Sequence, residues 1–221
     1  MTTDRARDPV HRIGYWSAVL CSVFSIAYVV AQLLEWTGVL GSAGGTESMS
    51  TPFGLALLLA PSLLLGSSFL VLMVCVHRWA PPARKVWSQI GLVFATAYAV
   101  LISLVYYVQL TFVAPRLARG DLERAEPFLF VPFDSFLYSV DLLGYTFMSV
   151  ATLFAAFAFT GEGIERTVRR FMIANGLLIP FLALQIYFNP LIWVASLWAI
   201  TFPGASISLA ALFRRPTARP R

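Results

Sequence analysis

The fold of this chain is decided by residues 134–159, whose sequence is DSFLYSVDLLGYTFMSVATLFAAFAF. The stretch is long and apolar enough to cross a bilayer, which takes about twenty residues in an α-helix. It nevertheless carries Asp141 in its interior. Because an ionised carboxylate is costly in hydrocarbon, we expect Asp141 to face protein or water and not lipid.

The polar residues of this stretch fall on one helical face. Asp134, Tyr138, Asp141, Tyr145 and Met148 follow one another at spacings of four, three, four and three residues. Side chains at these spacings lie above one another on a helix. The sequence therefore predicts a spanning helix with one polar stripe turned into the protein.

The composition of the whole chain agrees with a membrane protein. Apolar residues make up 58% of the sequence and charged residues only 12%, whereas soluble domains average about 25% charged. The net charge of +5 resides in short clusters at the ends of apolar runs, so it indicates membrane topology and no nucleic-acid partner. The two cysteines predict no disulfide framework.

Five other apolar runs have a similar length, so we expect an all-α bundle of six transmembrane helices forming one domain over residues 14–213. A polar segment, 1–13, precedes it and a basic tail, 214–221, follows. Pro61 and Pro203 predict bends within their helices. The predicted spans are 14–36, 52–76, 86–113, 135–160, 168–188 and 191–213.

The positions of the basic residues predict the orientation of this bundle. Of the 16 Lys and Arg residues, only Arg116, Arg119 and Arg124 fall on one side of the six spans. The other side holds both termini. Positive charge accumulates on the cytoplasmic side of membrane proteins, so we expect a multi-pass protein of the cell membrane with both termini in the cytoplasm.

With this topology, polar side chains of several spans lie at one level of the outer half. We hypothesise that they surround a ligand-binding pocket, with the apolar run 128–133 as a lid. Residues such as Tyr107, Tyr187, Trp193 and Trp198 lie at the same level. The residues predicted to bind are Asp141, Tyr138, Tyr145, Gln109, Tyr106, Gln32, Glu35 and Gln185.

A second interpretation explains the same residues without a ligand. Polar side chains and tyrosines are common where a membrane helix meets water, so Glu35, Asn189 and Asp134 are candidates for ordinary interfacial residues. Asp134 or Ser135 is also suited to cap the fourth helix. Asp141 itself suits a structural hydrogen bond to a neighbouring helix.

Other polar residues predict structural roles. His11, His77 and the cysteines match no metal signature, so we expect no metal and no cofactor. Asn175 suits a hydrogen bond between helices. Arg166, Arg169 and Arg170 share a helical face and are predicted to contact anionic lipid head groups.

Three classes of function remain open on sequence alone. The first, which the sequence favours, is a transporter or channel for a small molecule, ion or lipid, with Asp141 as a proton or cation site. The second is a binding, sensing or accessory subunit, which allows a homo-oligomer or a partner subunit. The third, a membrane enzyme with Asp141 as general acid or base, is disfavoured because no nucleophile, metal or cofactor motif accompanies it.

Overall fold

The computed structural model describes residues 9–45, 48–130 and 135–215. This part of the chain is helical and contains no strand. Six helical stretches are long and apolar enough to cross a membrane, which confirms the all-α prediction and the number of candidate spans. They are Pro9–Trp36, Pro52–Trp79, Pro82–Ala118, Phe136–Ala156, Ile164–Leu184 and Asn189–Arg214.

Three of these stretches consist of one uninterrupted α-helix each. They are α1 (Pro9–Trp36), α2 (Pro52–Trp79) and α6 (Phe136–Ala156). Helix α2 continues through Pro61. Thr51 begins α2 by accepting a hydrogen bond of 3.0 Å from the backbone N–H of Gly54, an ordinary N-terminal cap.

The third stretch changes its winding near its end. After η1 (Pro82–Arg84), helix α3 (Lys85–Val108) passes into a π-helical turn, η2 (Gln109–Val113), and then into α4 (Ala114–Ala118). Single π-helical turns are rare and are often found at functional sites. Two short helices, α5 (Leu122–Ala125) and η3 (Glu126–Phe128), follow in the connection to α6.

The last two stretches are interrupted, although the sequence predicts continuous spans. The fifth comprises α7 (Ile164–Gly176) and α8 (Ile179–Leu184), and the sixth comprises η4 (Asn189–Leu191), α9 (Ile192–Ala195) and α10 (Trp198–Arg214). Pro180 explains the first interruption, because it has no N–H for the carbonyl of Gly176. Helix α10 runs through Pro203, so the second interruption lies at residues 196–197.

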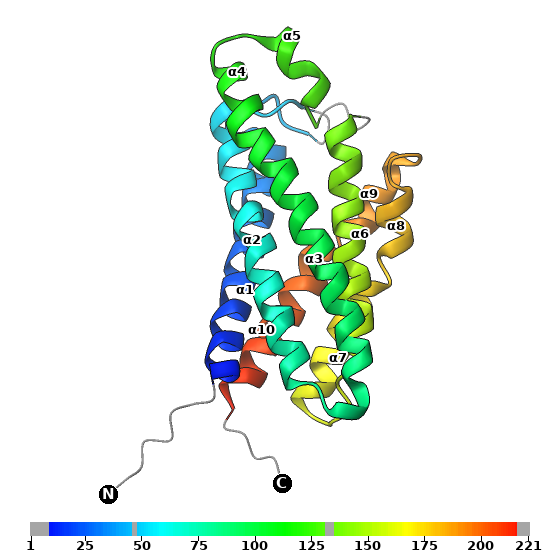
Figure 1. The fold of residues 1–221 in the computed structure, drawn as a ribbon. Helices are drawn as coiled ribbons and strands as arrows, with labels where there is room; N and C mark the ends of the chain where they lie inside the picture. The colour runs from blue at the N-terminus through cyan, green and yellow to red at the C-terminus, as the bar shows by residue number, and fades with distance from the viewer. Residues whose placement is uncertain (1–8, 46–47, 131–134, 216–221) are drawn as a thin grey trace, which may run out of the picture.

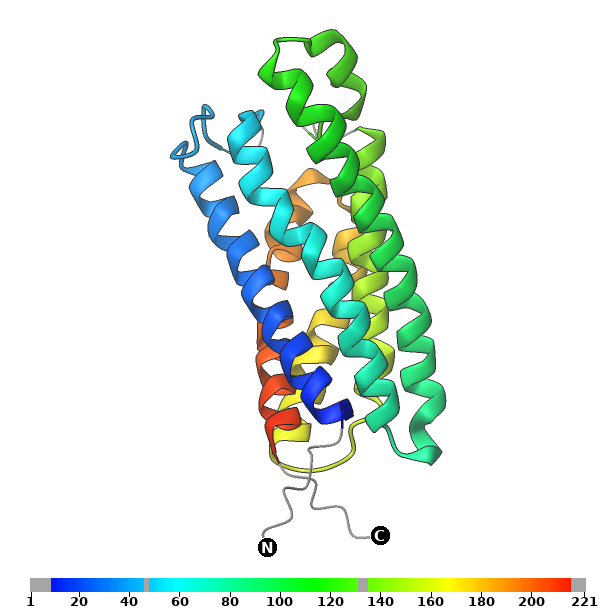
Figure 2. The same ribbon diagram turned by 60° about the vertical axis from the view of Figure 1, so that its left-hand side comes forward.

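The helices form a closed ring in which each packs against the next along the chain. The order is α1, α2, α3, α6, α7 and α10, and α10 returns to α1 (Figures 1 and 2). Near the closure, Nδ1 of His11 lies 3.2 Å from the carbonyl oxygen of Phe213. We call the end of the bundle that holds Pro9 and Arg214 the terminal end, and the other the distal end.

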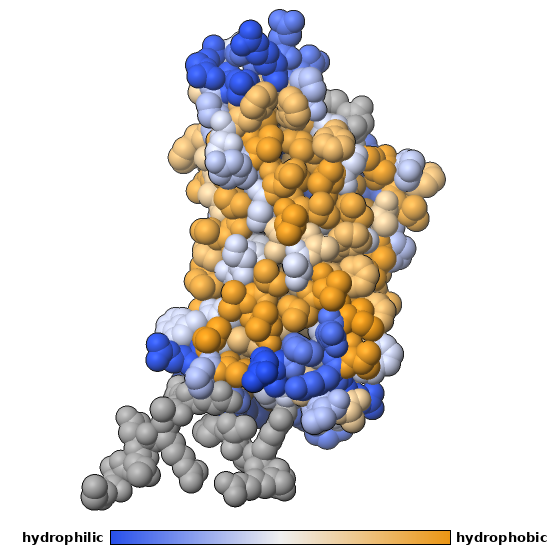
Figure 3. All heavy atoms as spheres, viewed as in Figure 1, coloured by the Kyte–Doolittle hydropathy of each residue, from blue (hydrophilic) through white to orange (hydrophobic). Residues whose placement is uncertain are grey.

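The surface suits a bilayer. On the face in view, Figure 3 shows an apolar belt across the middle of the molecule, between hydrophilic regions at the two ends. Large apolar side chains such as Val93, Val100 and Leu104 of α3 are exposed in this belt. A belt of this kind is far larger than the apolar patches of soluble monomers. The six apolar helices and this surface are thus compatible with a multi-pass membrane protein.

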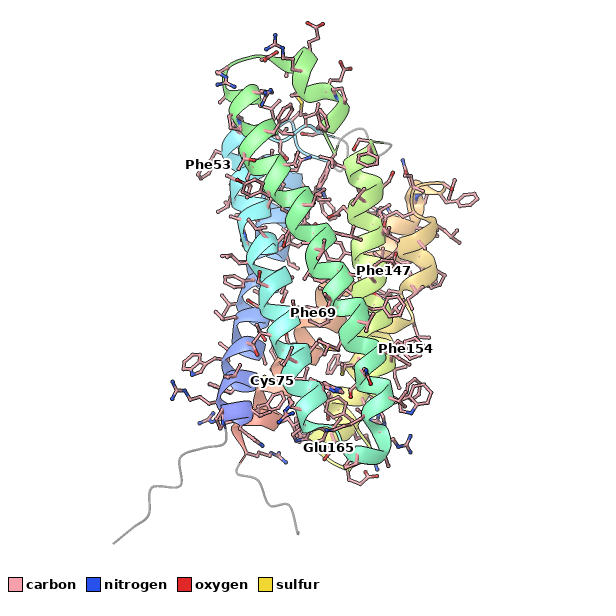
Figure 4. All side chains as sticks on the ribbon, in the orientation of Figure 1. Phe53, Phe69, Cys75, Phe147, Phe154 and Glu165 are labelled. Carbon is pink, nitrogen blue, oxygen red and sulfur yellow. The ribbon has the colours of Figure 1, made fainter. Side chains whose placement is uncertain are left out.

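Five aromatic side chains close the centre of the ring at mid-height. Phe69 projects from α2 (Figure 4) and contacts Tyr98 of α3, and Tyr98 contacts Tyr145 of α6. Tyr145 contacts Trp198 of α10, Trp198 contacts Phe202 of the same helix, and Phe202 contacts Phe69, which closes the set. Ring centroids of neighbours are 5.2 to 5.9 Å apart, and all five side chains are buried. We call this closed set of contacts the aromatic plug.

On the terminal side of the plug, one polar network connects three helices. The Nδ2 of Asn175 donates to Thr152 Oγ1 at 3.0 Å, and its Oδ1 accepts from the Thr201 hydroxyl at 3.0 Å. Asn175 is fully buried. The predicted role of Asn175 as a hydrogen bond between helices is therefore confirmed.

Candidate functional site

A cavity of about 450 Å³ lies on the distal side of the aromatic plug. This volume is within the range of small-molecule pockets in proteins. Tyr145 and Trp198 belong both to the plug and to the cavity wall, so the plug forms the cavity floor. All eight residues that the sequence singled out line this one space: Gln32, Glu35, Tyr106, Gln109, Tyr138, Asp141, Tyr145 and Gln185.

Helix α6 contributes the polar stripe that the sequence predicts for the fourth span. Tyr138, Asp141 and Tyr145 line the cavity and are buried. Ser135 caps the helix by accepting a hydrogen bond of 3.1 Å from the backbone N–H of Tyr138. Asp134, the other candidate cap, lies outside the described residues. The prediction that Asp141 avoids the lipid-facing surface is confirmed by its 8% exposure.

Helix α1 contributes a second stripe with the same spacing. Tyr28, Gln32 and Glu35 lie four and three residues apart and all line the cavity. The Tyr28 hydroxyl donates to Oε1 of Gln32 at 3.3 Å. Sequence reasoning missed Tyr28, although the spacing rule applied to the fourth span identifies it equally well in the first.

Glu35 occupies a niche made by a glycine. A Cβ atom at Gly54 would lie 2.6 Å from Oε2 of Glu35, so a larger residue there would require the carboxylate to move. Gly54 is in the first turn of α2, whose N-terminus carries partial positive charge. Glu35 is only 3% exposed. Glu35 is therefore not exposed at the surface, and its interpretation as a residue at the membrane interface stays a prediction.

The α3 side of the cavity carries a hydroxyl, an amide and an aromatic cover. The Tyr106 hydroxyl donates to that of Tyr145 at 3.1 Å. Gln109, in the π-helical turn, donates from Nε2 to the carbonyl of Phe128. Phe130 lines the cavity and contacts the rings of Tyr106 and Tyr138. Residues 131–133 of the predicted lid lie outside the described part of the chain.

The interrupted fifth and sixth spans close the remaining wall. Gln185, at the end of α8, donates a hydrogen bond from Nε2 to the Tyr138 hydroxyl. Ala195 and Ser196 line the cavity where α9 gives way to α10. The second interruption thus lies beside the site.

Asp141 sits among phenol groups. Tyr28, Tyr106, Tyr138 and Tyr145 line the same cavity as Asp141, and Tyr98 contacts the ring of Tyr145. Tyr98, a member of the plug, was missed by sequence reasoning, although it lies eight residues before the predicted Tyr106 and therefore on the same helical face.

Several acceptor atoms at the cavity have no partner. Among the described residues, neither oxygen of Glu35, nor Oδ1 of Asp141, nor Oε1 of Gln109 receives a hydrogen bond, although all are buried. Leaving a buried polar atom unpaired is costly, commonly about 1–3 kcal/mol. Unpaired atoms gathered around one cavity favour a missing ligand or water.

Exposed residues line the cavity at two places, which we interpret as its openings. Gly45 and Met49, in the connection from α1 to α2, line it and are exposed at the distal end. Leu33 of α1 and Ser196, just before α10, also line it and are exposed on the side of the bundle.

Other polar residues at this level turn outward. Tyr107, Tyr187 and Trp193 are each more than 60% exposed and do not line the cavity. Trp193 instead packs beside Trp36, with ring centroids 5.8 Å apart. A helical face, and not height in the span alone, decides which side chains reach the centre.

The three predicted lipid-binding arginines lie on α7 with different partners. Arg166 forms an ion pair with Glu162, and Arg170 is exposed. Arg169 is half-buried and donates to the carbonyl of Phe159 at 3.2 Å. A lipid role for all three stays a prediction, and Arg169 also contributes to holding the connection between α6 and α7.

The described residues contain no group of three or more His, Cys, Asp or Glu side chains that could hold a metal ion. No protein-family model matches the chain, and no curated protein or solved structure is significantly similar to it.

Proposed function

We propose that this is a multi-pass membrane protein whose distal cavity binds a small amphipathic molecule. Under the positive-inside rule the terminal end is cytoplasmic, so the distal cavity lies in the outer half of the membrane. The observation that carries the proposal is the set of unpaired, buried acceptors around an apolar space of about 450 Å³. Apolar walls with a few convergent polar groups are typical of ligand sites.

The aromatic plug favours binding over transport. A carrier needs a polar route through both halves of the membrane, and Phe69, Tyr98 and Phe202 fill the bundle on the terminal side of the cavity. A binder needs only the distal opening and the lateral one. The proposed role is that of a receptor, sensor or accessory subunit that holds its ligand in the outer half.

A carrier is the second candidate, because two spans are interrupted and one interruption adjoins the cavity. Interrupted helices surround the substrate sites of many transporters. Uptake of radiolabelled tetraethylammonium into vesicles containing the protein tests this candidate. A carrier that uses Asp141 as its cation site loses uptake in Asp141→Asn, whereas a binder shows no uptake in either form.

Ligand-induced stabilisation tests the binding proposal. The probe is decan-1-ol, a neutral amphiphile, added to the protein in phosphatidylcholine nanodiscs. A ligand at 100 times its Kd raises the free energy of unfolding by about 2.7 kcal/mol. We expect decan-1-ol to raise the melting temperature of the wild-type protein, followed by tryptophan fluorescence.

Two substitutions that fill the cavity provide the contrast. Ala199→Phe places a large side chain in the wall and narrows the cavity. Ser196→Phe obstructs the lateral opening, and residue 196 is exposed, so the fold tolerates a larger side chain there. Ala97→Phe, which lies outside the cavity lining, is the matched control. Both filling variants should lose the stabilisation and the control should keep it. Equal stabilisation of all four proteins would show that decan-1-ol acts through the bilayer, against the proposal.

A further inference from the structure

We infer that the ligand of the distal cavity is an amphiphilic primary amine in its ammonium form. The ammonium group donates hydrogen bonds to the free oxygens of the cavity, and the apolar chain extends toward the lateral opening. This inference rests on the proposed binding function and specifies the chemical class of its ligand.

Four of the unpaired atoms at the cavity require a donor from the ligand, and a fifth, Oγ of Ser48, can either donate or accept. Both oxygens of Glu35, Oδ1 of Asp141 and Oε1 of Gln109 can only accept when the two acids are ionised. An ammonium group offers three N–H donors and no acceptor. Hydrogen bonds from a charged donor to a carboxylate are about twice as strong as neutral ones.

The charge of the residues that line the cavity also favours a cationic ligand. Two carboxylates, those of Glu35 and Asp141, line the cavity, and none of the lining residues is Lys, Arg or His. The neighbouring segments 46–47 and 131–134, outside the described residues, contain no basic residue in their sequence either. An anionic ligand would meet uncompensated repulsion, whereas a cation neutralises buried charge.

Aromatic walls add a second attraction for a cation. Tyr28, Tyr106, Tyr138 and Trp198 line the same space as the two acids. The faces of Tyr and Trp rings attract ammonium groups, by about 2 kcal/mol or more where water is excluded. A cavity that combines carboxylates with aromatic faces thus suits an organic cation better than a bare metal ion.

The lateral opening accounts for the apolar part of the ligand. Leu33 and Ser196 line the cavity and are exposed on the side of the bundle, so an alkyl chain dissolved in the outer leaflet reaches the cavity without crossing water. Apolar lining residues such as Leu55, Leu59 and Leu142 receive the part of the chain next to the amine.

Four probes with one decyl chain separate charge from hydrogen-bond donation. They are decylammonium, decyltrimethylammonium, decan-1-ol and decyl sulfate, titrated into the protein in phosphatidylcholine nanodiscs with tryptophan fluorescence as readout. Trp36 and Trp198 line the cavity and report occupancy. We expect decylammonium to bind about tenfold more tightly than decyltrimethylammonium or decan-1-ol, the effect of one charge-assisted hydrogen bond, and decyl sulfate not to bind.

Neutral substitutions test the two acids individually. Asp141→Asn and Glu35→Gln should each weaken the binding of decylammonium by about tenfold and leave the affinity for decan-1-ol unchanged. Glu123→Gln removes an exposed carboxylate outside the cavity and is the matched control, which should not alter any affinity.

The outcomes distinguish this inference from the proposed function. If Ser196→Phe abolishes decan-1-ol binding but decylammonium binds no better than decan-1-ol, the cavity is a ligand site and the amine assignment is wrong. Decyltrimethylammonium binding as tightly as decylammonium also overturns the primary-amine assignment. If Ser196→Phe changes the affinity of no probe, both proposals fail.

Discussion

At the scale of single residues, Asp141 has the features of a group kept for binding at some cost in stability. It is buried, and its Oδ1 has no partner among the described residues. Sites shaped for function are commonly not optimal for stability. Its tyrosine neighbours belong to three helices, so its position is set by the whole distal half of the bundle.

This view predicts the stability of Asp141→Asn without ligand. The substitution keeps the shape of the side chain and removes a buried charge whose Oδ1 receives no hydrogen bond from the described residues. We expect the free energy of unfolding to stay the same or to rise by about 1 kcal/mol, measured as the thermal midpoint in nanodiscs. A clear loss of stability would instead support the alternative that Asp141 is a structural hydrogen-bond partner.

Eight of the lining residues could be predicted from the sequence because their charge or polarity and their helical spacing distinguish them from the apolar residues around them. Asp141 locates the polar face of its own span, and the basic residues on either side of the spans fix the level of the others. The niche at Gly54 and the cover by Phe130 could not be predicted, because they depend on contacts between residues far apart in the chain. The unpaired oxygens of Glu35 likewise become visible only in the packed structure.

At the scale of helices, α3 and α6 approach closely at a glycine. A Cβ atom at Gly91 would lie 2.7 Å from the backbone oxygen of Ala151, and backbone cannot move aside as a side chain can. At Gly66, between α2 and α3, the nearest atom would lie at an ordinary 3.7 Å. Both glycines are helical, so they form a matched pair.

Alanine at these two positions should change the stability of the protein differently. Gly91→Ala forces α3 and α6 apart, and overpacking of this kind costs about 1–3 kcal/mol. Gly66→Ala should be neutral or stabilise by up to about 1 kcal/mol, since alanine favours a helix. Thermal unfolding midpoints of the two variants compare the effects directly. Equal midpoints would show that the contact between α3 and α6 yields easily.

The continuous helices were easier to predict from sequence than the interrupted ones. Long apolar runs dictate that α1, α2 and α6 exist, and turn residues mark their ends. Pro180 offers a local reason for the gap between α7 and α8, yet Pro61 and Pro203 lie inside unbroken helices. The interruption at residues 196–197 has no proline or glycine, so tertiary packing decides it and no local pattern predicts it.

At the scale of the whole molecule, the proposed orientation is open to a labelling test. Arg84 lies in the connection between α2 and α3 at the terminal end, and Glu123 lies in the connection to α6 at the distal end; both are exposed. The native cysteines, Cys21 and Cys75, are buried. A membrane-impermeant maleimide should label Glu123→Cys in intact cells and Arg84→Cys only after lysis.

The parent protein, with no added cysteine, is the control for this labelling. Its two thiols should stay unlabelled while the bundle is folded. Labelling of Arg84→Cys in intact cells would reverse the orientation, and with it the assignment of the cavity to the outer half of the membrane.

The closure of the helical ring by α10 against α1 bears on how the protein is made. Of the six long helical stretches, the one with α1 is synthesised first and the one with α10 sixth, so α1 packs against α10 only after the five earlier stretches have been made. A nascent chain stopped before Trp198 lacks that neighbour and one wall of the cavity. The cavity is therefore completed only when the sixth stretch has been synthesised.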